Sequence, residues 1–195
     1  MIKNDENHQA RNVYYYGFQI VIGELVKTFF LILVSFFLGI LVPTLVMTFT
    51  FSSLRILAGG YHMNTYGKCL AVSMLMFWAA ALITKYAYPY LPVYFILLLL
   101  AFSFAAAVII IKKYAPGDTP NKPITEKSEI KKFKKLSFIH IFIWSVVMLV
   151  LIYFKQYCLV MASCFGILLE LFTITPSGYS FFDKISGRMS KNKGL

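Results

Sequence analysis

The chain combines a hydrophobic composition with a strong positive charge. It has 195 residues, of which 59% are hydrophobic and 14% charged, a mean hydropathy of +0.71 and a net charge of +11. These values exclude a surface that faces water, so the surrounding medium is expected to be lipid. They do not indicate nucleic-acid binding either, because the basic residues are not interleaved with aromatic side chains that stack on bases. The three cysteines are too few for a disulfide framework and are expected to be reduced thiols.

Six apolar windows predict membrane helices. They cover residues 25–42, 44–58, 69–84, 91–111, 136–154 and 157–175. The run Leu91–Ile111 alone exceeds the roughly 20 residues that a helix needs to cross the hydrocarbon core. Helices are expected because lipid offers backbone groups no partner outside a helix or a closed barrel, and no alternating barrel pattern is present. The sequence predicts an all-α, polytopic transmembrane bundle, with residues 1–195 forming one integral-membrane domain.

Three segments around these windows have features of their own. Residues 9–27 mix charged, tyrosine and apolar side chains, which is typical of a helix at the headgroup level before the first crossing. The window Thr44–Ala58 is short and rich in Thr and Ser, so it is expected either to re-enter the membrane or to be buried among other helices. Turn formers from Tyr114 onward predict a loop over 112–135. Its basic cluster at 127–135 is interpreted as a topology determinant, with a docking surface for an acidic partner as the alternative.

The basic residues divide unequally between the two sides of the predicted bundle. With six crossings, 17 of the 19 Lys and Arg residues lie on the side that holds both termini, the turn at 55–68 and the loop at 112–135. Lys85 and Lys155 lie on the other side. The positive-inside rule places both termini and the long loop in the cytosol. A basic cytosolic face would also attract anionic membrane lipids.

The candidate chemistry lies between the second and third windows. Gly59 and Gly60 are poor helix formers, so a break is expected before His62, and Gly67 permits a second bend before Cys69. On an unbroken helix His62 and Cys69 would lie roughly 10 Å apart along the axis. A catalytic pair therefore requires the chain to fold back. The imidazole would then take the thiol proton, leaving a thiolate that attacks a carbonyl.

The same residues also have structural interpretations. A cysteine at the mouth of a membrane helix is usually a small apolar filler, and a histidine near the headgroups is often an interfacial residue. A metal site is not expected because two ligands are too few, and no cofactor is indicated. Glu170 is costly inside a membrane helix and normally needs a partner. An ion pair with Arg55 or Lys27 is expected, with orientation of His62 as the alternative.

Two blocks of the sequence resemble the AgrB family of bacterial membrane cysteine endopeptidases. The first consists of Arg55, Gly59-Gly60-Tyr61-His62 and Cys69; the second of Tyr114-Ala115-Pro116 and Lys122-Pro123-Ile124 before the basic cluster. The resemblance covers nearly the whole chain and implies that His62 and Cys69 are the catalytic pair. Residues expected to support the site or bind the substrate are Arg55, Gly59, Gly60, Glu170, Lys131 and Lys132.

The resemblance also implies a substrate and a location. The substrate would be an AgrD-like quorum-sensing propeptide with an amphipathic N-terminal helix, a short core and an acidic C-terminal tail. Removal of the tail would leave a thioester on Cys69, which can pass to a side chain of the core and close a thiolactone or lactone. The protein would be a multi-pass protein of the bacterial cytoplasmic membrane with its site on the cytosolic side. A small bundle with polar interior residues is also compatible with a homodimer.

Two other classes of function fit parts of the sequence. A small transporter or exporter could use Glu170 and Arg55 along a path through the membrane. A non-catalytic scaffold or receptor would need only the basic loop. Loss of activity on substitution of His62 or Cys69 would separate the endopeptidase from both.

Overall fold

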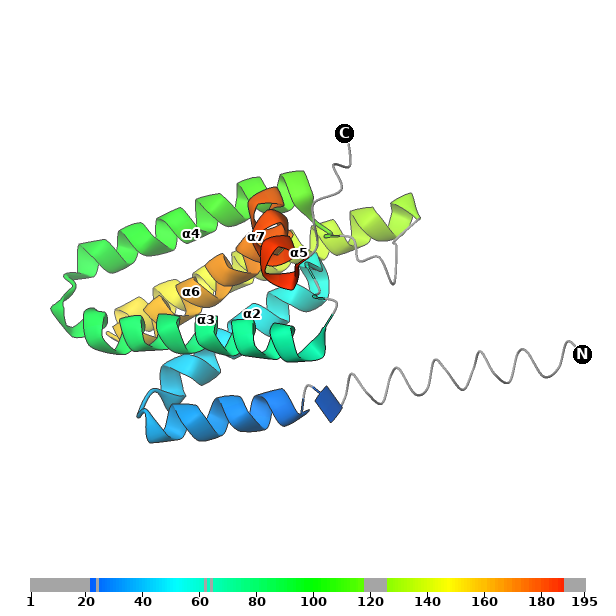
Figure 1. Ribbon diagram of the computed structural model, residues 1–195. Coiled ribbons are helices and arrows are strands. Elements are labelled where there is room, and N and C mark those ends of the chain that lie inside the picture. The colour runs from blue at the N-terminus through cyan, green and yellow to red at the C-terminus, as the bar shows by residue number, and fades with distance from the viewer. Residues whose placement is uncertain (1–21, 24, 62, 64, 118–125, 188–195) are drawn as a thin grey trace, which may run out of the picture.

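The computed structural model describes residues 22, 23, 25–61, 63, 65–117 and 126–187, and helices form most of this part of the chain (Figure 1). Within these residues, five helices are long and apolar enough to cross a membrane. They are α2 (Leu41–Ala58), α3 (Tyr66–Ala87), α4 (Val93–Tyr114), α5 (Lys127–Tyr153) and α6 (Tyr157–Ile174). A shorter apolar helix, Leu25–Phe37, precedes them, and α7 (Pro176–Ser186) follows. The predicted all-α architecture of a polytopic membrane bundle is confirmed.

The two N-terminal windows differ in length from the prediction. The first contains a helix of only Leu25–Phe37, which is followed by a turn where Gly39 has a φ of 65°. Helix α2 instead begins at Leu41, because Pro43 lies in its first turn, where backbone N–H groups have no acceptor within the helix. It reaches 18 residues and packs mainly against α6. Six of its 18 residues are buried in the bundle. Re-entry into the membrane and burial among other helices both stay predictions for this segment.

Helix α6 lies at the centre of the bundle and packs against α2, α4 and α5 (Figure 1). Gly166 permits the close approach of α2, because a Cβ atom there would lie 2.6 Å from the carbonyl oxygen of Met47. Polar side chains between the helices are hydrogen-bonded: Trp144 Nε1 donates to Ser163 Oγ (2.7 Å), and the hydroxyls of Ser163 and Thr50 are 3.0 Å apart. These bonds satisfy polar groups that lipid would leave unpaired.

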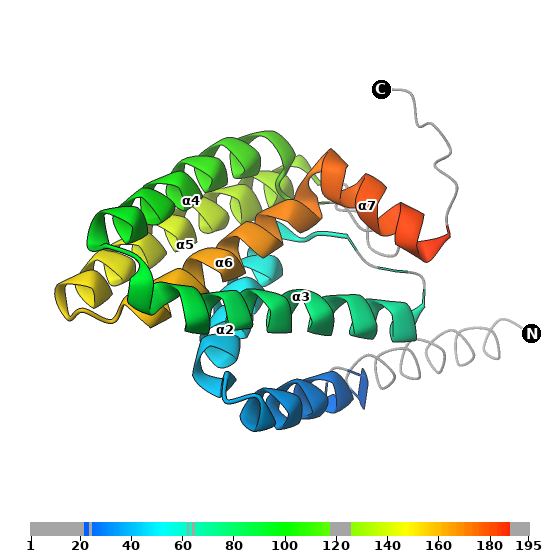
Figure 2. The same cartoon turned by 60° about the vertical axis from the view of Figure 1, so that its left-hand side comes forward.

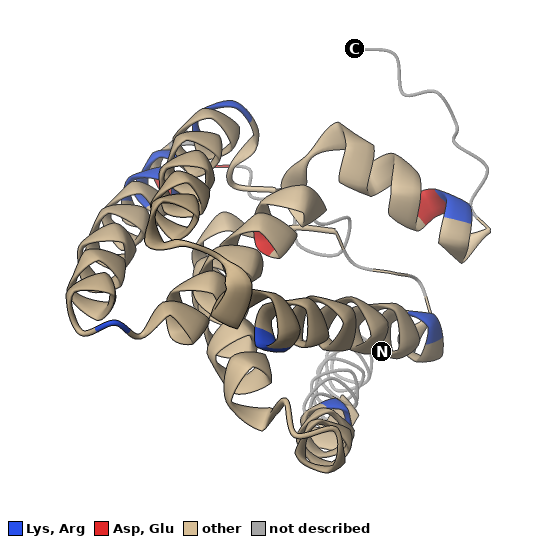
Figure 3. Ribbon diagram, turned by 90° about the vertical axis from the view of Figure 1, so that its left-hand side faces the viewer, with Lys and Arg blue, Asp and Glu red and all other residues tan. Residues whose placement is uncertain are grey.

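The outer surface of the bundle is apolar. Large hydrophobic side chains remain exposed along the membrane helices, among them Phe37, Phe49, Leu75, Phe102, Ile109 and Phe142. In Figure 3 the charged residues of the described chain gather near helix ends, and the ribbons are mostly uncharged along their length. A surface of this kind suits the hydrocarbon core of a bilayer.

The helices run back and forth, so their connections divide between two ends of the bundle. One end, called the loop end below, holds residues 59–61, 63 and 65, the end of α4 with residues 115–117, the start of α5, and the junction of α6 with α7 at Thr175. The opposite end holds residues 38–40, the 3₁₀ helix η1 (Tyr88–Tyr90) and residues 154–156.

The connection between α4 and α5 is shorter than predicted. Helix α4 ends at Tyr114, as expected, but α5 begins at Lys127 and extends through the whole basic cluster at 127–135. The expectation of a loop over these residues was wrong, because lysine is a good helix former and the cluster continues the helix beyond its apolar part. Lys131 and Lys132 are exposed on these first turns of α5.

Candidate functional site

The connection between α2 and α3 contains the break that the two glycines predict. Helix α2 ends at Ala58, and the next residues, Gly59 and Gly60, have φ angles of 71° and 144°. A Cβ atom on Gly60 would lie 2.5 Å from both Arg55 Nη1 and Thr173 Oγ1. Both the backbone angle and the space therefore require glycine at this position.

A second connection packs directly against this break. The N–H of Gly117 donates to the carbonyl oxygen of Ala58 at 2.6 Å, and Gly59 and Gly117 form a parallel bridge. A Cβ atom on Gly59 would overlap the carbonyl oxygen of Gly117. The residues from Tyr114 to Gly117 thus lie beside Gly59, although the two segments are far apart in the sequence. The importance of Gly117 has no local sequence signal and was not predicted.

Arg55 holds the break from the inside of the bundle. Its Nη1 atom lies 3.3 Å from Glu170 Oε2 and donates to Thr173 Oγ1 at 2.9 Å. Its Nη2 atom donates to the carbonyl oxygen of Tyr61 at 2.5 Å, and the N–H of Tyr61 donates to the carbonyl oxygen of Thr173 at 3.1 Å. The expected ion pair of Glu170 is therefore formed with Arg55. Because Arg55 also binds the carbonyl oxygen of Tyr61, the ion pair links Tyr61 to α6.

Helix α7 holds the side chain of the same tyrosine. The hydroxyl of Tyr61 donates to Asp183 Oδ1 at 2.7 Å. Its ring stacks on Phe182 at a centroid distance of 5.3 Å and meets Tyr179 edge-on at 5.1 Å. Tyr61 is consequently buried, with its backbone fixed by α6 and its side chain by α7.

Lys68 joins the start of α3 to the end of α7. Its Nζ atom donates to the carbonyl oxygens of Ser186 (3.1 Å) and Ile185 (3.4 Å). The last carbonyl groups of a helix lack N–H donors within the helix and attract cations. Figure 2 shows α7 on the same side of the bundle as the segment that connects α2 to α3. The contacts of α7 with Tyr61 and with Lys68 were not predicted from the sequence.

Cys69 lies in the first turn of α3. Its N–H donates to the carbonyl oxygen of Thr65 at 3.1 Å, and the residue is a free, partly exposed cysteine. The expected second bend at Gly67 is absent, because Gly67 already belongs to α3. The helix therefore begins before Cys69 and fixes its backbone. The predicted pairing of Cys69 with His62 involves a residue that lies outside the described part of the chain.

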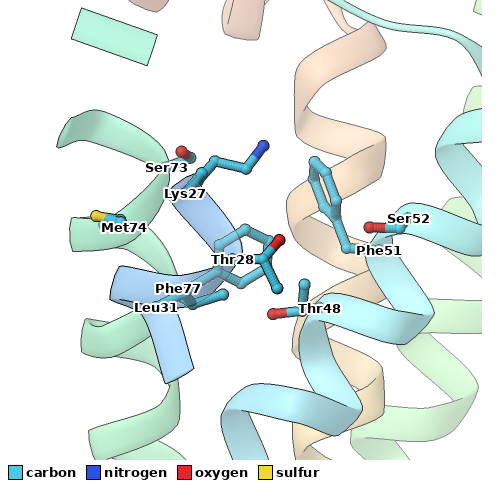
Figure 4. A pocket seen from close by; sticks show the side chains of 9 residues that line it. All are labelled: Lys27, Thr28, Leu31, Thr48, Phe51, Ser52, Ser73, Met74 and Phe77. Carbon is cyan, nitrogen blue, oxygen red and sulfur yellow. The ribbon is translucent and has the colours of Figure 1, made fainter. Parts of the chain in front are cut away.

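A small cavity, called the cavity below Cys69, lies beside α3 and begins at Ser73, one helical turn after Cys69 (Figure 4). It has a volume of about 70 Å³ and lies between the helix Leu25–Phe37, α2 and α3. Leu31, Phe51, Met74 and Phe77 supply its apolar lining, and Lys27, Thr28, Thr48, Ser52 and Ser73 its polar lining. Ser73 is one turn from Cys69 and donates to the Cys69 carbonyl oxygen at 2.7 Å. Residues four and eight positions apart share a helix face, so the face with Ser73 and Phe77 leads to Cys69.

The other predicted residues divide into two groups. Arg55, Gly59, Gly60 and Glu170 meet in one cluster at the loop end. Lys131 and Lys132 lie apart from that cluster, on the exposed first turns of α5, and no hydrogen bond or ion pair joins them to the described residues of the 59–69 segment.

Comparison with known proteins identifies the family. The family model of accessory gene regulator B, AgrB, matches residues 1–174. The chain belongs to the AgrB family. The match ends at the last residue of α6, so α7 lies beyond it.

Individual relatives agree with this assignment. An AgrB-like protein of Clostridium acetobutylicum is 28% identical over 177 residues, covering 90% of this chain and 78% of that protein. Accessory gene regulator protein B of Staphylococcus aureus is 27% identical over 169 residues, covering 82% and 80%. AgrB-like protein 2 of Clostridium perfringens is 23% identical over 183 residues, covering 88% and 84%. No solved structure matches the chain.

Proposed function

We propose that this AgrB-family protein is a membrane cysteine endopeptidase that removes the acidic C-terminal tail from an AgrD-like propeptide. The observation that carries the proposal is the placement of Cys69, a partly exposed thiol in the first turn of α3, the helix that follows the backbone break at Gly59 and Gly60. The two cysteines of α6 lack such a setting: Cys164 is fully buried, and Cys158 lies at the opposite end of the bundle. Cys69 is therefore the nucleophile.

The reaction follows the chemistry of a cysteine and histidine pair. His62 takes the proton of the Cys69 thiol, and the sulfur attacks the carbonyl carbon of the scissile peptide bond. The tetrahedral intermediate collapses, the C–N bond breaks, and the proton passes from His62 to the amine of the departing tail. The remaining thioester is attacked by water, or by a thiol or hydroxyl of the peptide core, which closes a ring.

The start of α3 offers donors for the oxyanion of the tetrahedral intermediate. A helix leaves its first backbone N–H groups without acceptors within the helix. In α3 these belong to Tyr66, Gly67 and Lys68, the residues just before Cys69. Such N–H groups stabilise negative charge that develops beside the nucleophile. The absence of a side chain on Gly67 leaves open space beside this turn.

The positive charge of the loop end favours binding of particular propeptide segments. By the positive-inside rule, the loop end, which carries most of the Lys and Arg residues, faces the cytosol. The exposed lysines of α5, including Lys131 and Lys132, attract the acidic tail there. An amphipathic leader binds the adjacent membrane surface. The cavity below Cys69 takes an apolar side chain next to the scissile bond.

The decisive experiment compares single substitutions in cells that co-express a propeptide with an amphipathic leader, a short core and an acidic tail. Cys69→Ala and His62→Ala should each abolish tail removal while the protein remains in the membrane fraction. Cys158→Ala is the matched control, because this cysteine lies at the opposite end of the bundle, and it should cleave normally. Continued cleavage by Cys69→Ala would refute the proposal.

A further inference from the structure

Helix α7 contacts the residue that precedes each member of the proposed catalytic pair. Tyr61 comes directly before His62, and Lys68 directly before Cys69. Asp183 accepts a hydrogen bond from the Tyr61 hydroxyl, and the end of α7 accepts hydrogen bonds from Lys68. One short helix is therefore bonded to the residue before His62 and to the residue before Cys69.

We infer that α7 is a positioning element of the active site, with Tyr61 and Asp183 as its positioning residues. The inference rests on the proposed function, since it concerns the placement of His62 relative to Cys69. It goes beyond the family assignment, because the family match ends at residue 174 and α7 begins at Pro176. Asp183 and Tyr61 touch neither substrate nor reacting atoms; they act through the adjacent His62.

The Tyr61 contacts are suited to fix a backbone. The backbone N–H of Tyr61 is bonded to Thr173, and its carbonyl oxygen to Arg55. Its ring is packed between Phe182 and Tyr179, and its hydroxyl is bonded to Asp183. Tyr61 is thus held at its backbone, ring and hydroxyl, and it directly precedes His62 in the sequence. A catalytic group needs this restriction, because a displacement of one ångström can lower a reaction rate severely.

The N-terminal end of α7 is fixed to the end of α6. Thr175 caps the helix, since its Oγ1 atom accepts a hydrogen bond from the N–H of Gly178 (3.2 Å), and Pro176 occupies the first helical position. A Cβ atom on Gly178 would overlap the carbonyl oxygen of Phe172. The helix is thus packed closely against the end of α6, and it carries Phe182 and Asp183 to Tyr61.

Helix α7 also has an apolar exposed face, which suggests a different role. Phe181 and Ile185 are four residues apart and remain 43% and 38% exposed. If α7 were only an anchor at the membrane surface, these two residues would matter and the hydroxyl of Tyr61 would not. The two roles therefore depend on different side chains of the same helix.

The test uses the full-length protein in membrane vesicles and the propeptide that it cleaves in a Cys69-dependent manner. Tyr61→Phe and Asp183→Ala each remove the hydrogen bond between the Tyr61 hydroxyl and Asp183 and retain the ring stacking. Each should lower kcat for tail removal about tenfold and leave KM unchanged, because the transition state and not substrate binding loses its geometry. The double variant should be no slower than the slower single variant, since both substitutions break the same bond.

Controls separate positioning from anchoring and from loss of folding. Tyr153→Phe changes a tyrosine that is 82% exposed at the opposite end and should keep wild-type kcat. Protection of the buried Cys164 from iodoacetamide and the amount of protein in the membrane report whether each variant is folded. A wild-type kcat in folded Tyr61→Phe and Asp183→Ala, or a change in KM alone, would overturn the inference while leaving the proposed endopeptidase intact. A loss confined to Phe181→Ala and Ile185→Ala would show that α7 is an anchor.

Discussion

Arg55 of α2 and Glu170 of α6 form an ion pair of 3.3 Å at the loop end of the bundle. The Glu170 side chain is 0% exposed, and its Oε1 atom has no hydrogen-bond partner among the described residues. The same guanidinium group also binds the backbone of Tyr61, directly after the glycine pair. The ion pair therefore links the two most closely packed helices to the segment that leads into the candidate site.

Substitution of Arg55 should destabilise the fold. Arg55→Gln leaves the buried Glu170 carboxylate without its partner, which typically costs about 3–5 kcal/mol. The double variant Arg55→Gln/Glu170→Gln should recover part of this loss, because two neutral amides can bond to each other. Thermal unfolding of the purified protein in one detergent measures both effects. Lys112→Gln, at an exposed position at the end of α4, is the matched control and should keep the wild-type Tm.

The same series tests whether Glu170 orients His62. If Glu170 acts only through its ion pair with Arg55, Glu170→Gln should reduce tail removal only to the extent that it also lowers the Tm. A Glu170→Gln protein with wild-type Tm and no tail removal would contradict that role and would place the carboxylate in the catalytic machinery.

Alanine at Gly60 should distort the site. A residue with a side chain is strained by about 1–3 kcal/mol in a sparsely populated backbone region. At Gly60 the φ angle is 144°, and the new Cβ atom would also displace the Arg55 guanidinium. Gly60→Ala should lower both Tm and the rate of tail removal.

Gly67 provides the control for this substitution. It lies in the first turn of α3 without a positive φ, and a Cβ atom there meets nothing within 4 Å. Gly67→Ala should leave the Tm unchanged or raise it, with a stabilisation of about 0.5–1 kcal/mol, because glycine is a poor helix former. Equal effects of the two substitutions would contradict the assignment of the break to Gly60.

The fold was largely predictable because hydropathy reports directly on contact with lipid. Each of the six apolar windows contains a helix in the structure. The boundaries were less predictable, since charge marks where the membrane ends and not where the helix ends. For this reason the basic cluster at 127–135 was assigned to a loop, whereas it forms the first turns of α5.

The site was predictable only where the type of one residue by itself constrains the backbone or requires a partner. The break at Gly59 and Gly60 follows from their backbone freedom, and the partner of Glu170 follows from the cost of an unpaired acid in lipid. The contact of Gly59 with Gly117 and the bond of Tyr61 to Asp183 join segments distant in the sequence. No periodicity or spacing indicates such contacts, so they emerge only from the packed structure.

Cysteine labelling should reveal the orientation of the bundle. Cys69 lies at the loop end and Cys158 at the opposite end, and both are partly exposed, whereas Cys164 is buried. In single-cysteine variants, a membrane-impermeant maleimide should label Cys69 in inside-out vesicles and Cys158 in right-side-out vesicles. Cys164 should react only after denaturation. The reverse pattern would place the loop end outside the cell and would contradict a cytosolic site.

The cavity below Cys69 should select the side chain next to the scissile bond. Thr48→Phe fills the space between α2 and α3. It should therefore lower kcat/KM about tenfold for propeptides with Leu or Phe next to the scissile bond, compared with propeptides that have Ala there. Phe77→Leu enlarges the cavity and should shift the preference in the opposite direction. Leu75→Phe is the control, because Leu75 is 64% exposed on α3 and does not line the cavity. If all three variants rank the propeptides as the wild type does, the side chain binds elsewhere, because a pocket that contacts it must discriminate by volume.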